Sequence, residues 1–85
     1  MSQEVERKIL ERLRKVVAEV LRVDEQTITL DTRYKEDLGA DSLDTVTLLM
    51  ALEEEFKGQI SDEEAEGLTT VGKTVAFIKD KMPAS

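Results

Sequence analysis

One serine lies where a glycine-containing loop leads into a strongly patterned helix, within residues 37–44 (DLGADSLD). Asp41 is a favourable N-cap residue, and Asp44 three positions later completes a capping-box pattern. Ser42 is therefore expected in the first helical turn, where backbone N–H groups lack intrahelical partners and the helix dipole is positive. Such a position favours a phosphate group. The residues alone leave two interpretations open: phosphate chemistry at Ser42, or a serine that only helps to start the helix.

The composition excludes most catalytic machinery. The 85-residue chain contains no histidine and no cysteine, which removes the usual general base, Ser-His pairs, disulfides and thiolate zinc sites. A calcium loop counted from Asp31 would need glycine where Glu36 stands. One counted from Asp37 would need it at Ser42. We therefore expect no metal site, no catalytic residue and no enzymatic activity.

Nearly all of the net negative charge comes from the segment that contains Ser42. The net charge is −7, and residues 36–66 alone carry eleven acidic side chains against one basic side chain, Lys57. Such a segment repels nucleic acid and steers partners with basic patches toward itself. No apolar run approaches the length of a membrane span, and the N-terminus lacks the apolar stretch of a signal peptide. We expect a soluble, cytoplasmic monomer with no nucleic-acid partner.

Hydrophobic periodicity predicts that residues 1–85 form a single all-α domain. In its first helix, apolar side chains recur on one face and charged side chains cover the opposite face. The predicted fold is a small antiparallel four-helix bundle with three long helices, one short helix and a long first loop. The helices are expected at about residues 3–21, 42–56, 62–66 and 70–82.

Capping residues predict where the later helices begin and end. Gly58 is expected to stop the second helix, and Gly67 the third. Ser61 begins a capping box with Glu64, and Thr70 is the expected cap of the last helix. The apolar repeat of the last helix continues to Met82, and Pro83 marks its end.

The long loop over residues 22–41 has no sustained period and no second strand to pair with. Loops of this length in small domains are often functional. Its apolar side chains are expected to hold it against the core, and Gly39 suits a tight turn just before Ser42. These apolar side chains are Ile28, Leu30, Tyr34 and Leu38.

The second helix has two apolar faces. Its predicted core face carries Thr45, Leu48, Leu49, Leu52 and Phe56. An outer strip of Leu43, Val46 and Met50 begins beside Ser42, with acidic side chains along its rim. If exposed, the outer strip is a docking surface for a partner protein. The alternative is that this helix packs on both sides.

Several of these segments together resemble the acyl carrier protein family. The resemblance rests on residues 39–46 (GADSLDTV) and 52–56 (LEEEF), and extends through residues 36–38, 61–66 and 69–71. It spans about residues 8–81 and is closest to the discrete carriers of fatty-acid synthesis.

The resemblance implies a specific role for Ser42. This residue would be esterified by 4′-phosphopantetheine, transferred from coenzyme A by a phosphopantetheinyl transferase. The thiol of that group would hold a growing acyl chain as a thioester. The implied partners are acyltransferase, ketosynthase, reductase and dehydratase enzymes with basic patches.

The resemblance also implies two sets of contact residues on the helices. Partner enzymes would contact Asp41, Leu43, Asp44, Val46, Met50, Glu53 and Glu54. The acyl chain would be lined by Leu48, Leu52, Phe56 and Ile78. Reversing the charges of Glu53 and Glu54 is expected to weaken docking with little loss of helicity.

Two alternatives to a fatty-acid carrier stay open. Thr47 stands where fatty-acid carriers usually have glutamate, which leaves room for a specialised carrier in polyketide or other lipid synthesis. The second alternative is an unmodified adaptor subunit that binds a partner through the outer strip.

Overall fold

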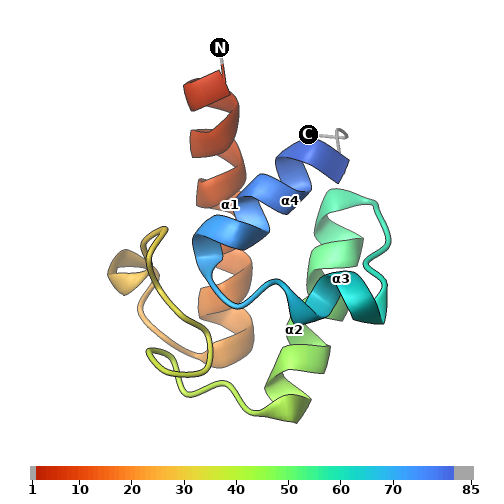
Figure 1. Ribbon diagram of the computed structural model, residues 1–85. Coiled ribbons are helices and arrows are strands. Elements are labelled where there is room, and N and C mark those ends of the chain that lie inside the picture. The colour runs from red at the N-terminus through yellow and green to blue at the C-terminus, as the bar shows by residue number, and fades with distance from the viewer. Residues whose placement is uncertain (1, 82–85) are drawn as a thin grey trace.

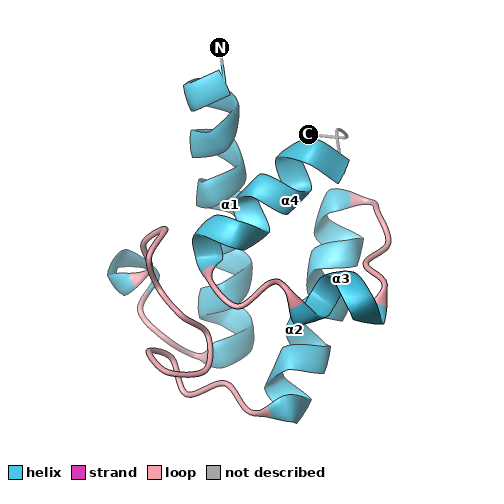
Figure 2. Ribbon diagram, viewed as in Figure 1, coloured by secondary structure: helices cyan, strands magenta, loops and turns pink. Residues whose placement is uncertain are grey.

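The computed structural model describes residues 2–81, and these residues form an all-α fold (Figures 1 and 2). The predicted fold class is confirmed. A short 3-10 helix, η1, follows the first long helix and is capped by Asp24, whose side chain accepts a hydrogen bond from the Gln26 N–H at 2.9 Å. The elements in chain order are α1 (Ser2–Leu21), η1 (Glu25–Thr27), α2 (Ser42–Phe56), α3 (Asp62–Glu66) and α4 (Val71–Lys81).

α1 is the helix against which the other long helices pack. It contacts both α2 and α4, and α1 and α2 run in opposite directions (Figure 1). Its apolar stripe buries Ile9, Leu13 and Val17 almost completely, as an amphipathic helix with one core-facing side requires. At the start of the stripe, Val5 is 40 % exposed.

An arginine joins α1 to the end of α2. The Arg12 guanidinium donates to the Glu55 carboxylate at 3.1 Å and to the Glu55 carbonyl oxygen at 2.7 Å. The guanidinium also lies 4.5 Å from the centroid of the Phe56 ring, within the range of a cation–π interaction. These contacts fix the end of α2 against α1.

The long loop is held to α4 through backbone hydrogen bonds. The carbonyl oxygens of Thr32 and Leu30 accept hydrogen bonds from the N–H groups of Val71 and Gly72, at 2.9 and 2.8 Å. The loop therefore supplies partners for the first amides of α4, which have none within the helix. Gly72 permits this approach, because a Cβ there would lie 2.8 Å from the Leu30 carbonyl oxygen.

Side chains hold the loop only in part as expected. Ile28 and Tyr34 are buried, and Leu38 is half-buried against the core. The prediction for Leu30 is wrong: its side chain is 49 % exposed. The loop is anchored at this residue through the carbonyl group instead.

α2 ends at Phe56, as predicted, but the residue in the left-handed conformation at this end is Lys57 and not Gly58. Lys57 takes the left-handed conformation, with φ of 57°, and its N–H donates to the Glu53 carbonyl oxygen. The Gly58 N–H donates to the same oxygen at 3.2 Å, which completes a Schellman-type end. The positive charge of Lys57 also lies near the negative end of the helix dipole, which is a favourable position for it.

The other capping predictions are confirmed. Ser61 and Glu64 form a capping box at α3, and Gly67 caps the end of that helix. The Thr70 hydroxyl accepts from the Lys73 N–H at 3.1 Å, so α4 begins at Val71, one residue later than expected. The predicted last residue, Met82, and the breaker Pro83 lie outside the described residues.

Candidate functional site

Ser42 is the first residue of α2, and its side chain is exposed. The Asp41 carboxylate accepts from the Asp44 N–H at 2.8 Å, and the Asp44 carboxylate accepts from the Asp41 N–H at 3.3 Å. The predicted capping box is therefore confirmed. It holds Ser42 between its two members, in the turn whose amides have no carbonyl partner within the helix. An added phosphate at the Ser42 hydroxyl would meet the positive end of the α2 dipole and would displace no core residue.

The loop before Ser42 is built as a tight turn. Gly39 has a φ of 69°, a conformation that favours glycine, and its N–H donates to the Lys35 carbonyl oxygen at 3.1 Å. Ala40 is buried, and its N–H donates to the Tyr34 carbonyl oxygen at 3.0 Å. Ser42 is thus presented by a turn that is fixed on the side facing the core.

A carboxylate stabilises the same turn further upstream. The Arg33 N–H donates to the Asp37 carboxylate at 2.8 Å, and the Arg33 guanidinium lies 3.3 Å from it. These bonds from Arg33 hold the pKa of the Asp37 carboxyl below its usual value. The Asp37 carboxylate therefore stabilises the turn through Arg33 and makes no hydrogen bond to Ser42 in the described structure.

The outer strip is exposed along its full length. Leu43, Val46 and Met50 are 74 %, 53 % and 64 % exposed. The alternative in which α2 packs on both sides is therefore wrong. Thr47 lies in the same exposed part of α2, and its hydroxyl donates to the Leu43 carbonyl oxygen at 3.0 Å.

The two acidic residues beside the outer strip differ in their surroundings. Glu54 is exposed. Glu53 is half-buried, and its carboxylate accepts from the Ile60 N–H at 2.7 Å. Reversing the charge of Glu53 would therefore also remove a hydrogen bond to the segment between α2 and α3, whereas the same change at Glu54 would not.

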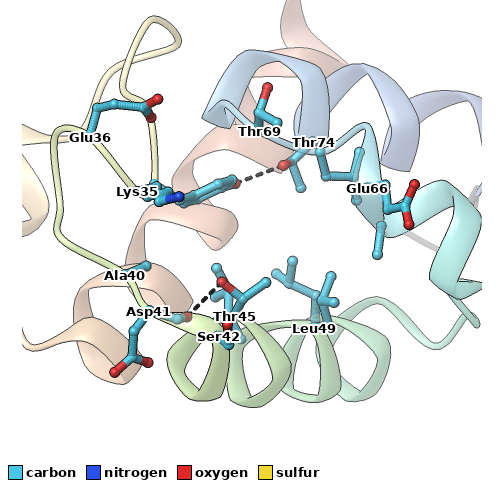
Figure 3. Close-up of a pocket in the computed structure, with 15 residues that line it drawn as sticks. Lys35, Glu36, Ala40, Asp41, Ser42, Thr45, Leu49, Glu66, Thr69 and Thr74 are labelled. Atoms are coloured by element: carbon cyan, nitrogen blue, oxygen red, sulfur yellow. Dashed lines mark hydrogen bonds between the residues drawn. The ribbon is translucent and has the colours of Figure 1, made fainter.

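A cavity of about 590 Å³ lies beside Ser42. Its wall on one side comes from α2 and includes Ser42, Thr45 and Leu49, while Thr69 and Thr74 line it from the opposite side (Figure 3). The lining is predominantly apolar, as is usual for cavities that bind small molecules. Charged side chains of Lys35, Glu36 and Glu66 also belong to the lining.

The predicted chain-lining residues divide into two pairs. Leu48 and Leu52 line the cavity. Phe56 and Ile78 are each 1 % exposed and are not among its lining residues, because both pack within the hydrophobic core.

Sequence reasoning missed the polar part of the cavity lining. Tyr34 donates its phenolic proton to the Thr74 hydroxyl at 2.7 Å, and both side chains are buried. Burial raises the pKa of the Tyr34 phenol to about 12. The signal available in the sequence was the only tyrosine of the chain, placed in the long loop, but its partner lies 40 residues away.

The described residues include no group of three or more acidic side chains placed to hold a metal ion. None of the helices within residues 2–81 has the length and apolar character needed to cross a membrane. The site therefore consists of one exposed serine, an adjoining cavity and an exposed apolar strip with an acidic rim.

Comparison with known protein families agrees with this arrangement. A family model described as "Phosphopantetheine attachment site" matches residues 11–78, which include the end of the loop, Ser42 and all of α2. The match covers most of the chain, and the group attached in this family is 4′-phosphopantetheine. This chain therefore belongs to the phosphopantetheine attachment-site family, in agreement with its resemblance to the acyl carrier proteins.

Proposed function

We propose that this protein is an acyl carrier whose 4′-phosphopantetheine is attached to Ser42 and which delivers acyl chains to the enzymes of fatty-acid synthesis. The observation that carries the proposal is the position of Ser42. It is exposed at the first turn of α2, at the wall of a largely apolar cavity and at the start of the outer strip. The helix start suits a phosphate, the cavity suits an acyl chain, and the outer strip suits a partner protein.

Each part of the chain has a defined task in this function. When bound, 4′-phosphopantetheine supplies the thiol that carries the acyl group as a thioester. Asp41 and Asp44 hold the helix start in place around Ser42. The chain itself needs no general base, because partner enzymes perform the chemical steps.

Partners would recognise α2 through apolar contact and charge. The outer strip offers Leu43, Val46 and Met50, and the proposed acidic contacts are Asp41, Asp44, Glu53 and Glu54. Acidic residues of this kind accelerate encounter with a basic partner more than they strengthen the final complex. Suitable partners are the phosphopantetheinyl transferase and the acyltransferase, ketosynthase, reductase and dehydratase enzymes. We further propose that residues 1–85 act as one cytoplasmic, monomeric carrier unit.

A second candidate is a specialised carrier for polyketide or other lipid synthesis. The observation that favours it is Thr47, which is exposed beside the outer strip and removes one acidic contact there. The two carriers share the attachment at Ser42 and differ in the enzymes that dock on α2.

Intact-mass measurement after enzymatic loading tests the attachment. The apo protein is incubated with a phosphopantetheinyl transferase, coenzyme A and magnesium. We expect the wild-type protein to gain the mass of one phosphopantetheinyl group, and Ser42→Ala to gain none. Ser61→Ala, which changes another exposed serine next to a helix start, is the matched control and should be loaded normally. Absence of a mass gain in the wild type, or a gain that survives Ser42→Ala, would favour the unmodified adaptor instead.

A further inference from the structure

The cavity beside Ser42 presents hydroxyl oxygens whose protons are already used. The Thr74 hydroxyl donates to the Thr70 carbonyl oxygen at 3.0 Å. The Tyr34 phenol donates to Thr74 Oγ1 at 2.7 Å. Because each hydroxyl has a single proton, the direction of both bonds is determined, and neither proton is available to a molecule in the cavity.

At the more exposed part of the cavity, Thr45 follows the same pattern. The Thr45 hydroxyl donates to the Asp41 carbonyl oxygen at 2.9 Å (Figure 3). Thr69 is different: its Oγ1 accepts from the Lys73 ammonium group at 3.3 Å, which leaves the hydroxyl proton of Thr69 available to donate. The hydroxyl oxygens of Tyr34, Thr74 and Thr45 therefore present lone pairs, with Tyr34 and Thr74 in the buried part of the lining. In the loaded protein the Ser42 oxygen is esterified and has no proton, which leaves the exposed Thr69 as the hydroxyl that can donate.

A cavity with this lining distinguishes cargo by its hydrogen-bonding groups. A hydroxyl group on an acyl chain can donate to the Tyr34 oxygen and so offset its own loss of hydration. A keto group on the same carbon has only lone pairs and would face the lone pairs of Tyr34 without a proton between them. The high pKa of the phenol keeps Tyr34 neutral, so its single proton stays on the bond to Thr74.

We propose that Tyr34 and Thr74 make this cavity selective for hydroxyacyl chains over ketoacyl chains of the same length. The proposal rests on the proposed function, because the cargo must be tethered at Ser42. Tyr34 is the specificity-determining residue that contacts the cargo hydroxyl. Thr74 is a positioning residue, since it holds the Tyr34 proton away from the cavity.

Two variants change the lining in opposite ways. Thr74→Val removes the acceptor for the Tyr34 proton, which then becomes available to a keto oxygen. The double variant Tyr34→Phe/Thr74→Val has no hydroxyl at either position. Thr47→Val is the matched control: its hydroxyl also donates to a carbonyl four residues earlier, but on the exposed part of α2 and away from the cavity lining.

The test measures how well the protein protects each thioester from hydroxylamine. Wild type and variants are loaded to completion with 3-hydroxyacyl, 3-oxoacyl or unsubstituted chains of one length, from the corresponding acyl-coenzyme A. Protection is defined as the cleavage rate of the free acyl-pantetheine thioester divided by the cleavage rate of the same acyl group on the protein. This ratio removes differences in the intrinsic reactivity of the three cargoes. Circular dichroism verifies that each variant is folded.

We expect the wild type and Thr47→Val to protect the 3-hydroxyacyl chain roughly threefold to tenfold better than the 3-oxoacyl chain, as one neutral hydrogen bond permits. In Thr74→Val, protection of the 3-oxoacyl chain should rise to that of the 3-hydroxyacyl chain. In the double variant, protection of the 3-hydroxyacyl chain should fall to that of the 3-oxoacyl chain. The unsubstituted chain should be protected alike in all variants.

Three outcomes would overturn the proposal. Equal protection of the two substituted chains in the wild type would do so, as would a preference that persists in the double variant. An equal loss for all three cargoes in the double variant would show that Tyr34 accepts from an amide of the prosthetic group instead. If Thr74→Val does not fold, the double variant still decides. Failure to load the wild type at Ser42 would refute the carrier function itself. This outcome is detected by intact-mass measurement before any cleavage rate is recorded, so it is distinguished from a failure of the selectivity proposal.

Discussion

Tyr34 has a buried phenol, and its ionisation can be used to measure how tightly the long loop is held. Burial raises its pKa from 10.0 to about 12, and the bond to Thr74 opposes that rise only partly. The neutral phenol is therefore favoured in the folded protein. Its contribution to stability is fully present below pH 10 and is lost as the pH rises through the folded pKa near 12.

The free energy of unfolding should consequently fall by about 2 to 3 kcal/mol over this pH interval, at about 1.4 kcal/mol per pKa unit. The measurement is urea denaturation at several alkaline pH values. Tyr34→Phe has no phenol to ionise at this position, so its pH dependence of stability comes from lysines and other groups. The predicted fall is therefore the difference in the free energy of unfolding between the wild type and Tyr34→Phe. Parallel stability curves for wild type and Tyr34→Phe would show that the phenol is not desolvated.

The residues of the site differ in how well the sequence predicts them. The capping box around Ser42 is predictable because Asp41 and Asp44 are three residues apart, and their bonds depend only on local geometry. The pair of Tyr34 and Thr74 is not predictable in this way, since the fold alone brings them together. The bond from the Ile60 N–H to Glu53 likewise depends on a turn whose shape has no pattern of residue types.

Among the elements, α2 has the clearest division between a core face and an exposed face. Leu48, Leu52 and Phe56 are buried, while the outer strip is exposed. The core face contributes most of the burial of this helix, and we expect substitutions in the outer strip to affect the proposed docking more than folding. This property separates a docking defect from a folding defect.

Glu54→Lys tests docking at this helix. Glu54 is exposed, and reversing its charge should slow loading of Ser42 by the transferase about threefold to tenfold at low ionic strength, because steering by the acidic segment is weakened. The deficit should shrink as salt is added. Initial loading rates from intact mass provide the measurement.

Glu63→Lys is the matched control for this prediction. It makes the same change of charge at an exposed position on α3, outside the outer strip and its rim. Equal slowing by the two variants would mean that only the total charge matters. Unchanged rates in Glu54→Lys at low salt would contradict electrostatic docking on α2. Glu53→Lys is unsuitable here, because it would also break the bond to the Ile60 N–H.

The long helices were predictable because they repeat apolar residues with the helical period, and α2, α3 and α4 begin at a polar cap. The long loop was predictable only in part, since the carbonyl oxygens of Thr32 and Leu30 also anchor it to the first amides of α4. Every residue has such a carbonyl group, so no sequence pattern identifies the ones that bond. The left-handed ends of α1 and α2, at Arg22 and Lys57, were missed for a related reason: glycine is the usual residue there.

At the scale of the whole molecule, the charge is strongly uneven. Residues 36–66 hold eleven acidic side chains and one basic side chain, whereas the rest of the chain is slightly positive. The acidic segment covers α2 and α3. Glu54 and Glu55 are exposed near the C-terminal end of α2, where the helix dipole is also negative. In the proposed function, the acidic side chains of this segment attract a basic partner. In the free protein, the same side chains repel one another and lower the stability of the fold.

The free protein should be stabilised by ions that screen this repulsion. We expect sodium chloride or a low concentration of magnesium to raise the melting temperature by about 4 to 8 °C from its value at low ionic strength, corresponding to roughly 1 kcal/mol in a domain of this size. Thermal unfolding followed by circular dichroism measures the shift. Glu54→Gln should melt at a higher temperature than the wild type at low salt and respond less to added salt, because one of the repelling charges is absent. A fall in melting temperature on addition of magnesium would contradict the prediction and would show that the acidic residues of this segment are compensated within the fold.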